Sequence, residues 1–254
     1  MKRLRIKSLR NQINRLFAKS GWQFISRKTL ERFILPNRAG LAHLDLYHCL
    51  GEIIAPNQMS CCLDVGANIG QTATKFRAYY PNSTIYCFEP VSDSYESLRA
   101  ATESDSKIQC FQYAVSNKSG ENVQIHLHPD SQCHSLRISP HSTGAFEIVE
   151  SVTVDSFQKS NSLPIINLLK TDTEGFDVEV LQGAKDSLSA GIIQSVYVEV
   201  CFDSSDRSHS DFFAVAELLE QCGLSFFGLF EQSTRQNPHQ LFYANALFIS
   251  RQLK

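Results

Sequence analysis

The strongest constraint on the fold is an alternation of short apolar segments and helical patterns that begins at residue 61. Short apolar runs bounded by turn residues occupy 61–65, 84–88, 108–111, 165–171 and 196–200. Most of the segments between them repeat apolar side chains at the helical spacing of three to four residues. Strands that alternate with helices predict an α/β fold, an open and mostly parallel sheet with helices on both faces.

The end of the chain predicts a different kind of strand pairing. The apolar segments 225–230 and 241–249 follow each other with only a polar loop between them, which indicates a closing antiparallel hairpin and brings the main sheet to seven strands. Ser208-x-x-Asp211 resembles a capping box for the helix before this hairpin. Apolar and polar residues alternate over 123–128, and 151–154 is a further strand candidate, so we expect an inserted β-hairpin within 114–156.

Charge divides the chain into two parts. Residues 1–40 hold 11 of the 24 Lys and Arg residues and one of the 26 acids, which leaves 13 basic and 25 acidic residues in 41–254. Apolar residues of the first part lie at helical spacing, so we expect 1–40 to be a basic amphipathic helical extension and 41–254 to be one α/β domain. The extension suits docking on its own acidic domain, a homodimer contact or peripheral contact with an anionic membrane.

Composition excludes several classes of protein. No apolar run approaches the length of a membrane span, and the basic start lacks the apolar core and cleavage site of a secretory signal. The eight cysteines show no CxxC spacing, which favours reduced thiols and a cytoplasmic protein, with the inner membrane surface as an alternative location. The acidic body disfavours nucleic acid as a partner.

Carboxylates follow successive strands of the predicted sheet. Asp64 and Glu89 come at the ends of the first two strands, and Asp172 and Glu174 follow the run 165–171. Glu199 lies near the end of the next strand. Ligands of such sheets bind outside the carboxyl ends of the strands, so we expect these side chains to mark the site.

The turn after the first strand is the most informative segment. Gly66 and Gly70 flank it, and the N–H groups that open the following helix suit an anionic ligand group. Asn68 and Gln71 stand where the dinucleotide pattern requires its second and third glycines. The segment therefore favours a nucleoside cofactor without a pyrophosphate, with Glu89 accepting hydrogen bonds from a ribose, and it argues against a nucleotide-dependent oxidoreductase.

Asp172 and Glu174 are two residues apart and repel each other, so they need a compensating group. Lys170, the sulfonium of a cofactor, or a divalent metal held together with Glu199 would each serve. Alternatively, Glu174 is an acidic residue at the start of the following helix.

The histidines give weaker signals. His126 and His128 share one face of a strand, with Cys133 and His134 nearby, but this spacing matches no standard zinc site. A solvent-facing strand is the favoured interpretation, and a catalytic base on the hairpin is an alternative. The other histidines are interpreted as surface or core residues: His43, His48, His141, His209 and His239.

Five segments together resemble the FkbM family of S-adenosylmethionine-dependent methyltransferases: 63–71, 88–90, 114–120, 154–157 and 170–184. The resemblance implies a Rossmann-like class I methyltransferase fold. It also implies that Asp64, Gly66, Asn68 and Gly70 hold the methionine end of the cofactor and that Glu89 binds the ribose.

The resemblance further implies that Ala114 and Val115 lie by the adenine. Many members of this family methylate hydroxyl groups on sugars, glycans or secondary metabolites, so O-methylation of a small-molecule or glycan acceptor is the leading hypothesis. Methylation of a non-sugar molecule at oxygen, nitrogen or a carboxylate is an alternative, as is a non-catalytic cofactor-binding protein. An alcohol needs a base, and we expect Asp172 to contact the acceptor hydroxyl and Glu174 to position it. No metal is included in this prediction.

Overall fold

The protein is described by a computed structural model at residues 45–128, 144–203, 206, 208–234 and 241–253. The predicted basic extension, 1–40, lies outside the described residues. The main sheet contains β1 (Cys61–Val65), β2 (Thr84–Phe88), β3 (Ile108–Phe111), β7 (Leu168–Thr171), β8 (Ser195–Cys201), β9 (Ser210–Asp211), β10 (Leu224–Thr234) and β11 (Leu241–Ser250).

The strand order of this sheet is β10-β11-β8-β7-β1-β2-β3, and the two-residue β9 pairs with β8 off this path. β1 pairs in parallel with β2 and β7, whereas β11 runs antiparallel to both β8 and β10. The predicted seven-stranded sheet and closing hairpin are therefore confirmed, and β9 is an addition to them. Because the chain moves outward from β1 through β2 to β3 and then returns beside β1 as β7, the switch point lies between β1 and β7, where open α/β sheets bind ligands.

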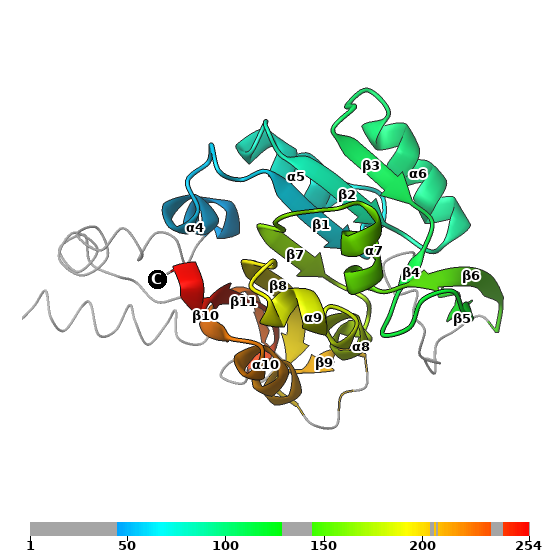
Figure 1. The fold of residues 1–254 in the computed structure, drawn as a ribbon. Helices are drawn as coiled ribbons and strands as arrows, with labels where there is room; N and C mark the ends of the chain where they lie inside the picture. Colours follow the sequence, from blue (N-terminus) through cyan, green and yellow to red (C-terminus); the bar gives the residue numbers. More distant parts are fainter. Residues whose placement is uncertain (1–44, 129–143, 204–205, 207, 235–240, 254) are drawn as a thin grey trace, which may run out of the picture.

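Helices cover both faces of the sheet (Figure 1). One face packs against α4 (Leu46–Ile53), α5 (Gln71–Tyr79) and α6 (Ser92–Thr102). The other packs against α7 (Val154–Ser160), α8 (Asp177–Gln182), α9 (Lys185–Ser189) and α10 (Phe212–Gln221), and the 3₁₀ turn η3 (Arg251–Leu253) ends the described chain. β1 serves both layers, because Leu63 and Val65 join one core cluster and Cys62 joins the other.

The start of α10 differs from the prediction. Asp211 is its N-cap and accepts a hydrogen bond from the Ala214 N–H, whereas Ser208 lies in the preceding loop. The capping box with Ser208 at its head was therefore wrong. The Ser208 N–H donates to Asp206 instead, which draws this loop into a local turn.

A second, smaller sheet contains β4 (Ala114–Val115), β5 (Asn122–His126) and β6 (Phe146–Val152) in the order β4-β6-β5. β5 and β6 are antiparallel, which confirms the inserted hairpin; β4, which pairs in parallel with β6, was not predicted. This sheet lies on the side towards which the β1 and β7 arrows point (Figure 1). Ser92, at the start of α6, donates its N–H and hydroxyl to Glu147 of β6 and so ties the hairpin to the sheet.

The described cysteines agree with the prediction of reduced thiols. All seven of them are free, and five are buried against the sheet in the two main core clusters: Cys49, Cys61, Cys62, Cys87 and Cys222. Within the described part of the chain, none of the helices has the length and apolar character that crossing a membrane requires.

Candidate active site

The loop between β1 and α5 follows a path that only small residues permit. Gly66 and Gly70 have φ values of 71° and 94°, and Asn68 is also left-handed at 48°. A Cβ atom on Gly66 would lie 1.9 Å from the Asp172 carbonyl oxygen, so this loop packs directly on the end of β7. The two segments that the sequence singled out therefore touch at the switch point of the sheet.

Glu89 holds the same loop from the β2 side. Its side chain accepts hydrogen bonds from the N–H groups of Asn68 (2.9 Å) and Val91 (3.0 Å), and the residue is 6% exposed. Burial raises the pKa of Glu89 to about 7, although both hydrogen bonds oppose this rise. Glu89 is thus fixed in orientation at the strand end where the sequence places it.

Asp64 lies beneath the loop and has no exposed surface. Its carboxylate is 3.1 Å from the Lys170 ammonium, which donates to the Gly66 carbonyl oxygen at 2.9 Å and lies 3.5 Å from Asp172. Burial raises the pKa of Asp64 and Lys170 opposes that rise; burial also lowers the pKa of Lys170, but the facing carboxylates outweigh it. Lys170 is therefore the compensating cation of Asp172 that the sequence suggested, and it is shared with Asp64.

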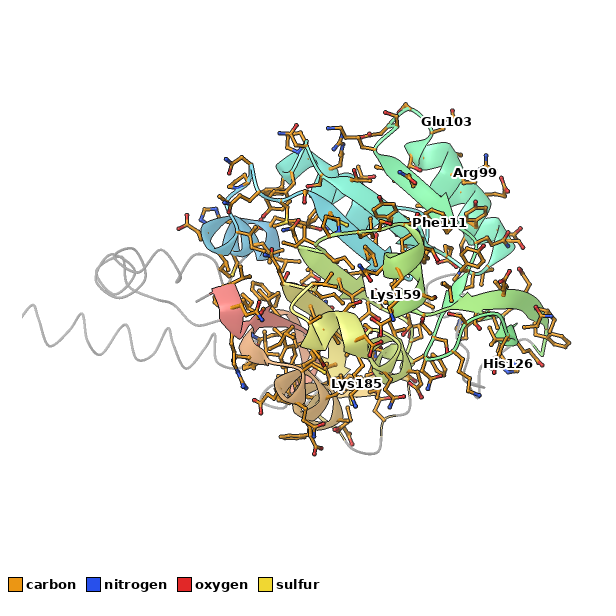
Figure 2. All side chains as sticks on the ribbon, viewed as in Figure 1. Arg99, Glu103, Phe111, His126, Lys159 and Lys185 are labelled. Atoms are coloured by element: carbon orange, nitrogen blue, oxygen red, sulfur yellow. The ribbon has the colours of Figure 1, made fainter. Side chains whose placement is uncertain are left out.

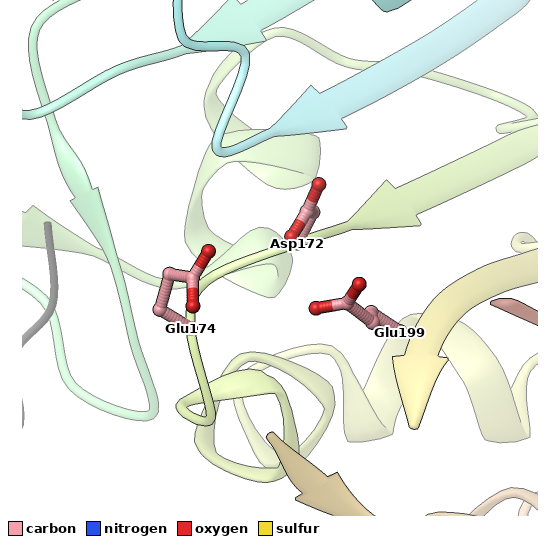
Figure 3. Close-up of side chains that lie close together, drawn as sticks. All are labelled: Asp172, Glu174 and Glu199. Atoms are coloured by element: carbon pink, nitrogen blue, oxygen red, sulfur yellow. The ribbon is translucent and has the colours of Figure 1, made fainter. Parts of the chain in front are cut away.

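Three carboxylates meet at the carboxyl ends of β7 and β8. Asp172, Glu174 and Glu199 each bring one oxygen within 4.8 Å of the others, and Figure 3 shows them converging on one space. Burial, followed by the charges of Asp172 and Glu174, raises the pKa of Glu199 to about 8. The structure thus brings together the two acids that the sequence proposed as catalytic and adds Glu199 to them.

The loop that carries these acids is fixed by Asp177, which the sequence analysis did not single out. Asp177 is 1% exposed, and its carboxylate accepts hydrogen bonds from the Thr171 hydroxyl, from the Thr173 N–H and hydroxyl, and from the Ser210 hydroxyl. Glu174 adopts a left-handed φ of 53° within this loop. These contacts hold Glu174 against the site, so it lies outside α8 rather than on its first turn.

Asp172, Glu174 and Glu199 are also the group among the described residues that could hold a metal ion. Oxygen ligands of this kind suit Mg²⁺ or Ca²⁺. Acidic side chains also gather where the protein's own cations compensate them, and Lys170 contacts Asp172 directly. We therefore assign no metal to this cluster.

His209 joins the cluster from the segment between β8 and β9. Its Nε2 lies 3.6 Å from Glu199, and its Nδ1 lies 2.8 Å from Asp206. The sequence analysis interpreted His209 as a surface or core residue and therefore missed this contact. The spacing Asp206-x-x-His209 before a helix was the available signal, because residues three apart in a turn face each other.

The remaining candidates lie in the smaller sheet. Ala114 and Val115 form β4 and are 2% and 5% exposed, and their expected place by the adenine stays a prediction. Figure 2 places His126 out on the hairpin. The metal-competent group of the described residues does not include His126 or His128, while Cys133 and His134 lie outside those residues.

Comparison with known proteins finds similarity to methyltransferases. The profile of the family described as "Methyltransferase FkbM domain" matches residues 64–226, which is more than half of the 254-residue chain. "Methyltransferase 1" of Beauveria bassiana is 27% identical over 187 residues, covering 65% of this chain and 72% of that protein. "Hexuronic acid methyltransferase AglP" of Haloferax volcanii is 24% identical over 163 residues, covering 64% and 62%.

A third relative, "2-O-methyltransferase NoeI" of Sinorhizobium fredii, is 25% identical over 144 residues, covering 50% of this chain and 58% of that protein. The match therefore spans about three fifths of the length of AglP and NoeI. Among solved structures, the N-terminal domain of EvdMO1, crystallised in the presence of SAH and D-fucose, aligns over 82% of both chains with a TM-score of 0.45 and 9% identity.

Proposed function

The chain belongs to the FkbM methyltransferase family, and we propose that it transfers the methyl group of S-adenosylmethionine to a hydroxyl group of a sugar or glycan. Two relatives support this acceptor class, since one is named for hexuronic acid and the other for 2-O-methylation. The observation that carries the proposal is the contact between the Gly66 loop and the end of β7. In this proposal the Gly66–Gly70 loop and Glu89 form the cofactor cradle, which lies beside a cluster of carboxylates.

The residues of the cradle fit S-adenosylmethionine. Asn68 Oδ1 is buried and, among the described residues, has no hydrogen-bond partner, so a donor group of the cofactor would satisfy it. Gly66 and Gly70 give the loop its left-handed turns, and each Glu89 oxygen that accepts an N–H keeps a second lone pair for a ribose hydroxyl. Asp64 has no exposed surface, and in this proposal it acts through Lys170, which holds the Gly66 carbonyl.

The acceptor hydroxyl would lie between the cradle and the carboxylate cluster. When bound, the cofactor supplies an electrophilic methyl group. Asp172 accepts a hydrogen bond from the hydroxyl and aligns its oxygen, while Glu174 fixes the position of the acceptor from the same loop. The carboxylate cluster would accept the proton of the acceptor hydroxyl as its oxygen takes the methyl group.

The cofactor is tested by isothermal titration with S-adenosylmethionine and S-adenosylhomocysteine, with NAD for comparison. We expect micromolar binding of the first two ligands and about 10-fold or greater loss in Glu89→Ala, because hydrogen bonds to an ionised group contribute about 1.5–3 kcal/mol. Tight binding of NAD alone would contradict the assignment.

The reaction is tested with a panel of sugars and glycans that includes uronic acids. Asp172→Asn should lower turnover about 100-fold or more with a much smaller change in cofactor affinity, while Asp93→Asn, at an exposed position on α6, should leave turnover unaltered. Cofactor binding without methylation of any acceptor would instead favour a binding protein.

A further inference from the structure

The imidazole of His209 contacts Asp206 and two aromatic rings. Its Nδ1 lies 2.8 Å from the Asp206 carboxylate, and its ring stacks on Tyr243 with centroids 4.9 Å apart and planes 12° apart. The Phe242 ring meets the imidazole edge-on, with ring centroids 5.8 Å apart. The side chains of His209 and Asp206 are only 15% and 8% exposed. Such a ring has one orientation, and that orientation points Nε2 at Glu199, 3.6 Å away.

The segment that carries His209 is fixed to β8 and to α8. Ser210, the next residue, begins β9, which pairs in parallel with β8 opposite Val200. The Ser210 hydroxyl also donates to Asp177 at 2.9 Å, which is the residue that fixes the loop of Asp172. The contacts of Ser210 therefore fix the position of His209 beside the acid cluster.

The charges around Glu199 come from every element packed against it. Asp172 and Glu174 of the β7–α8 loop and Asp177 of α8 are negative, and Lys170 of β7 is positive. On the β8–β9 side the titratable groups are His209 and Asp206, and on β11 the neighbour of the ring is Tyr243.

Three acids thus act on Glu199 from one side, together with Lys170. Burial and these acids raise the pKa of Glu199 to about 8, and Lys170 opposes the rise. His209 faces Glu199 from the segment between β8 and β9, with its Nδ1 2.8 Å from Asp206 and its Nε2 3.6 Å from Glu199.

We propose that His209, oriented by Asp206, is a positioning residue that holds Glu199, the proton acceptor of the reaction, and favours its ionised form through the facing Nε2. The inference rests on the proposed function, in which the acceptor hydroxyl loses its proton as the oxygen–methyl bond forms. Asp172 aligns the hydroxyl, the Glu199 carboxylate takes its proton, and the carbon–sulfur bond breaks, so the charges and atoms balance.

The test compares His209→Gln and Asp206→Asn with His48→Gln, an exposed control on α4, in the full chain. For the unaltered protein, kcat/KM should rise with pH through a midpoint near 8. His209→Gln should move that midpoint upward by about one pH unit and lower kcat about 10-fold or more at pH 7.5, with the affinity for S-adenosylmethionine unchanged. Asp206→Asn should change the profile in the same direction by less.

A purely structural role for His209 would lower the rate equally at all pH values, and that result overturns the proposal. Loss of turnover on chelation with recovery on adding Mg²⁺ would also overturn it, because a cation would then compensate the acids. If the unaltered protein methylates no acceptor, the proposed function fails separately. The inference is then tested through unfolding at pH 8.5, where His209→Gln and Glu199→Gln should be non-additive by at least five-fold in the equilibrium constant; additive effects overturn it.

Discussion

At the scale of single residues, the site depends on one close approach between two backbones. Gly66 of the cofactor loop and Asp172 of the acceptor loop are so close that a Cβ on the glycine would lie 1.9 Å from the Asp172 carbonyl oxygen. The Lys170 ammonium then joins the same two loops by contacting the Gly66 carbonyl and the Asp172 carboxylate. Cofactor binding and acceptor alignment are therefore coupled through a few atoms.

Gly66→Ala tests this coupling. The left-handed φ of 71° costs an alanine about 1–2 kcal/mol, and the contact with Asp172 forces a further backbone shift. Gly120→Ala is the matched control, since Gly120 has a φ of 75° but nothing within 4 Å of its would-be Cβ. Denaturant unfolding and calorimetric titration should show that both variants lose stability but only Gly66→Ala also loses cofactor affinity. Equal affinities in the two variants would contradict the coupling.

At the scale of elements, several segments that resemble the family pack against each other. A Cβ on Gly183, at the end of α8, would lie 2.1 Å from the Ser116 carbonyl oxygen beyond β4. Asp155 of α7 accepts hydrogen bonds from the N–H groups of Asp186 and Ser187 and from the Ser187 hydroxyl, and so fixes the start of α9. These motifs are informative because they dock the smaller sheet, α7 and α9 around the site.

Two aspartates allow the effect of stability on turnover to be separated from the effect of holding the acidic loop. Asp177→Ala leaves donors of Thr171, Thr173 and Ser210 without their acceptor and should cost about 2–3 kcal/mol in the free energy of unfolding. Asp155→Ala removes the contacts at the start of α9 and should cost about 1–2 kcal/mol. Turnover at a temperature where both variants are folded should fall only in Asp177→Ala, because only Asp177 holds the loop of the acids. A similar loss in Asp155→Ala would mean that stability alone controls the rate.

At the scale of the whole molecule, the sequence predicted what depends on local pattern. The bounds of β1, β2 and β3 agree with the predicted runs, because a buried strand between turn residues is an apolar run of the same length. The carboxylates at the strand ends were found for the same reason, since the topology places all carboxyl ends of parallel strands at one edge.

What the sequence could not predict depends on contacts between distant segments. Asp177 reaches Ser210 across 33 residues, and His209 faces Glu199 only because β9 pairs with β8. The cap of α10 also differed, because Ser208 satisfies the capping pattern as well as Asp211 does and only the path of the preceding loop decides between them. Local pattern therefore located the acids but not the residues that orient them.

The raised pKa values of Glu89 and Glu199 predict how the stability of the whole molecule depends on pH. Unfolded glutamates ionise near pH 4.5, whereas the folded pKa is about 7 for Glu89 and about 8 for Glu199. The folded state therefore keeps protons that the unfolded state releases, so their contribution to stability is fully present below about pH 4.5 and is lost as pH rises through 7 to 8. At about 1.4 kcal/mol per pKa unit, these shifts correspond to about 3.5 kcal/mol for Glu89 and about 5 kcal/mol for Glu199.

Unfolding free energies of the unaltered protein should therefore fall between pH 5 and pH 9. The fall should become smaller by roughly 3 kcal/mol in Glu89→Gln and by roughly 4 kcal/mol in Glu199→Gln, because an amide has no proton to release. Glu217→Gln, at an exposed position on α10, removes the same formal charge and should leave the slope unaltered. Urea unfolding at five pH values measures the slope for all four proteins. An unchanged slope in both Glu89→Gln and Glu199→Gln would show that the two glutamates ionise in the folded protein as they do in the unfolded chain. Their raised pKa values would then not explain how stability depends on pH.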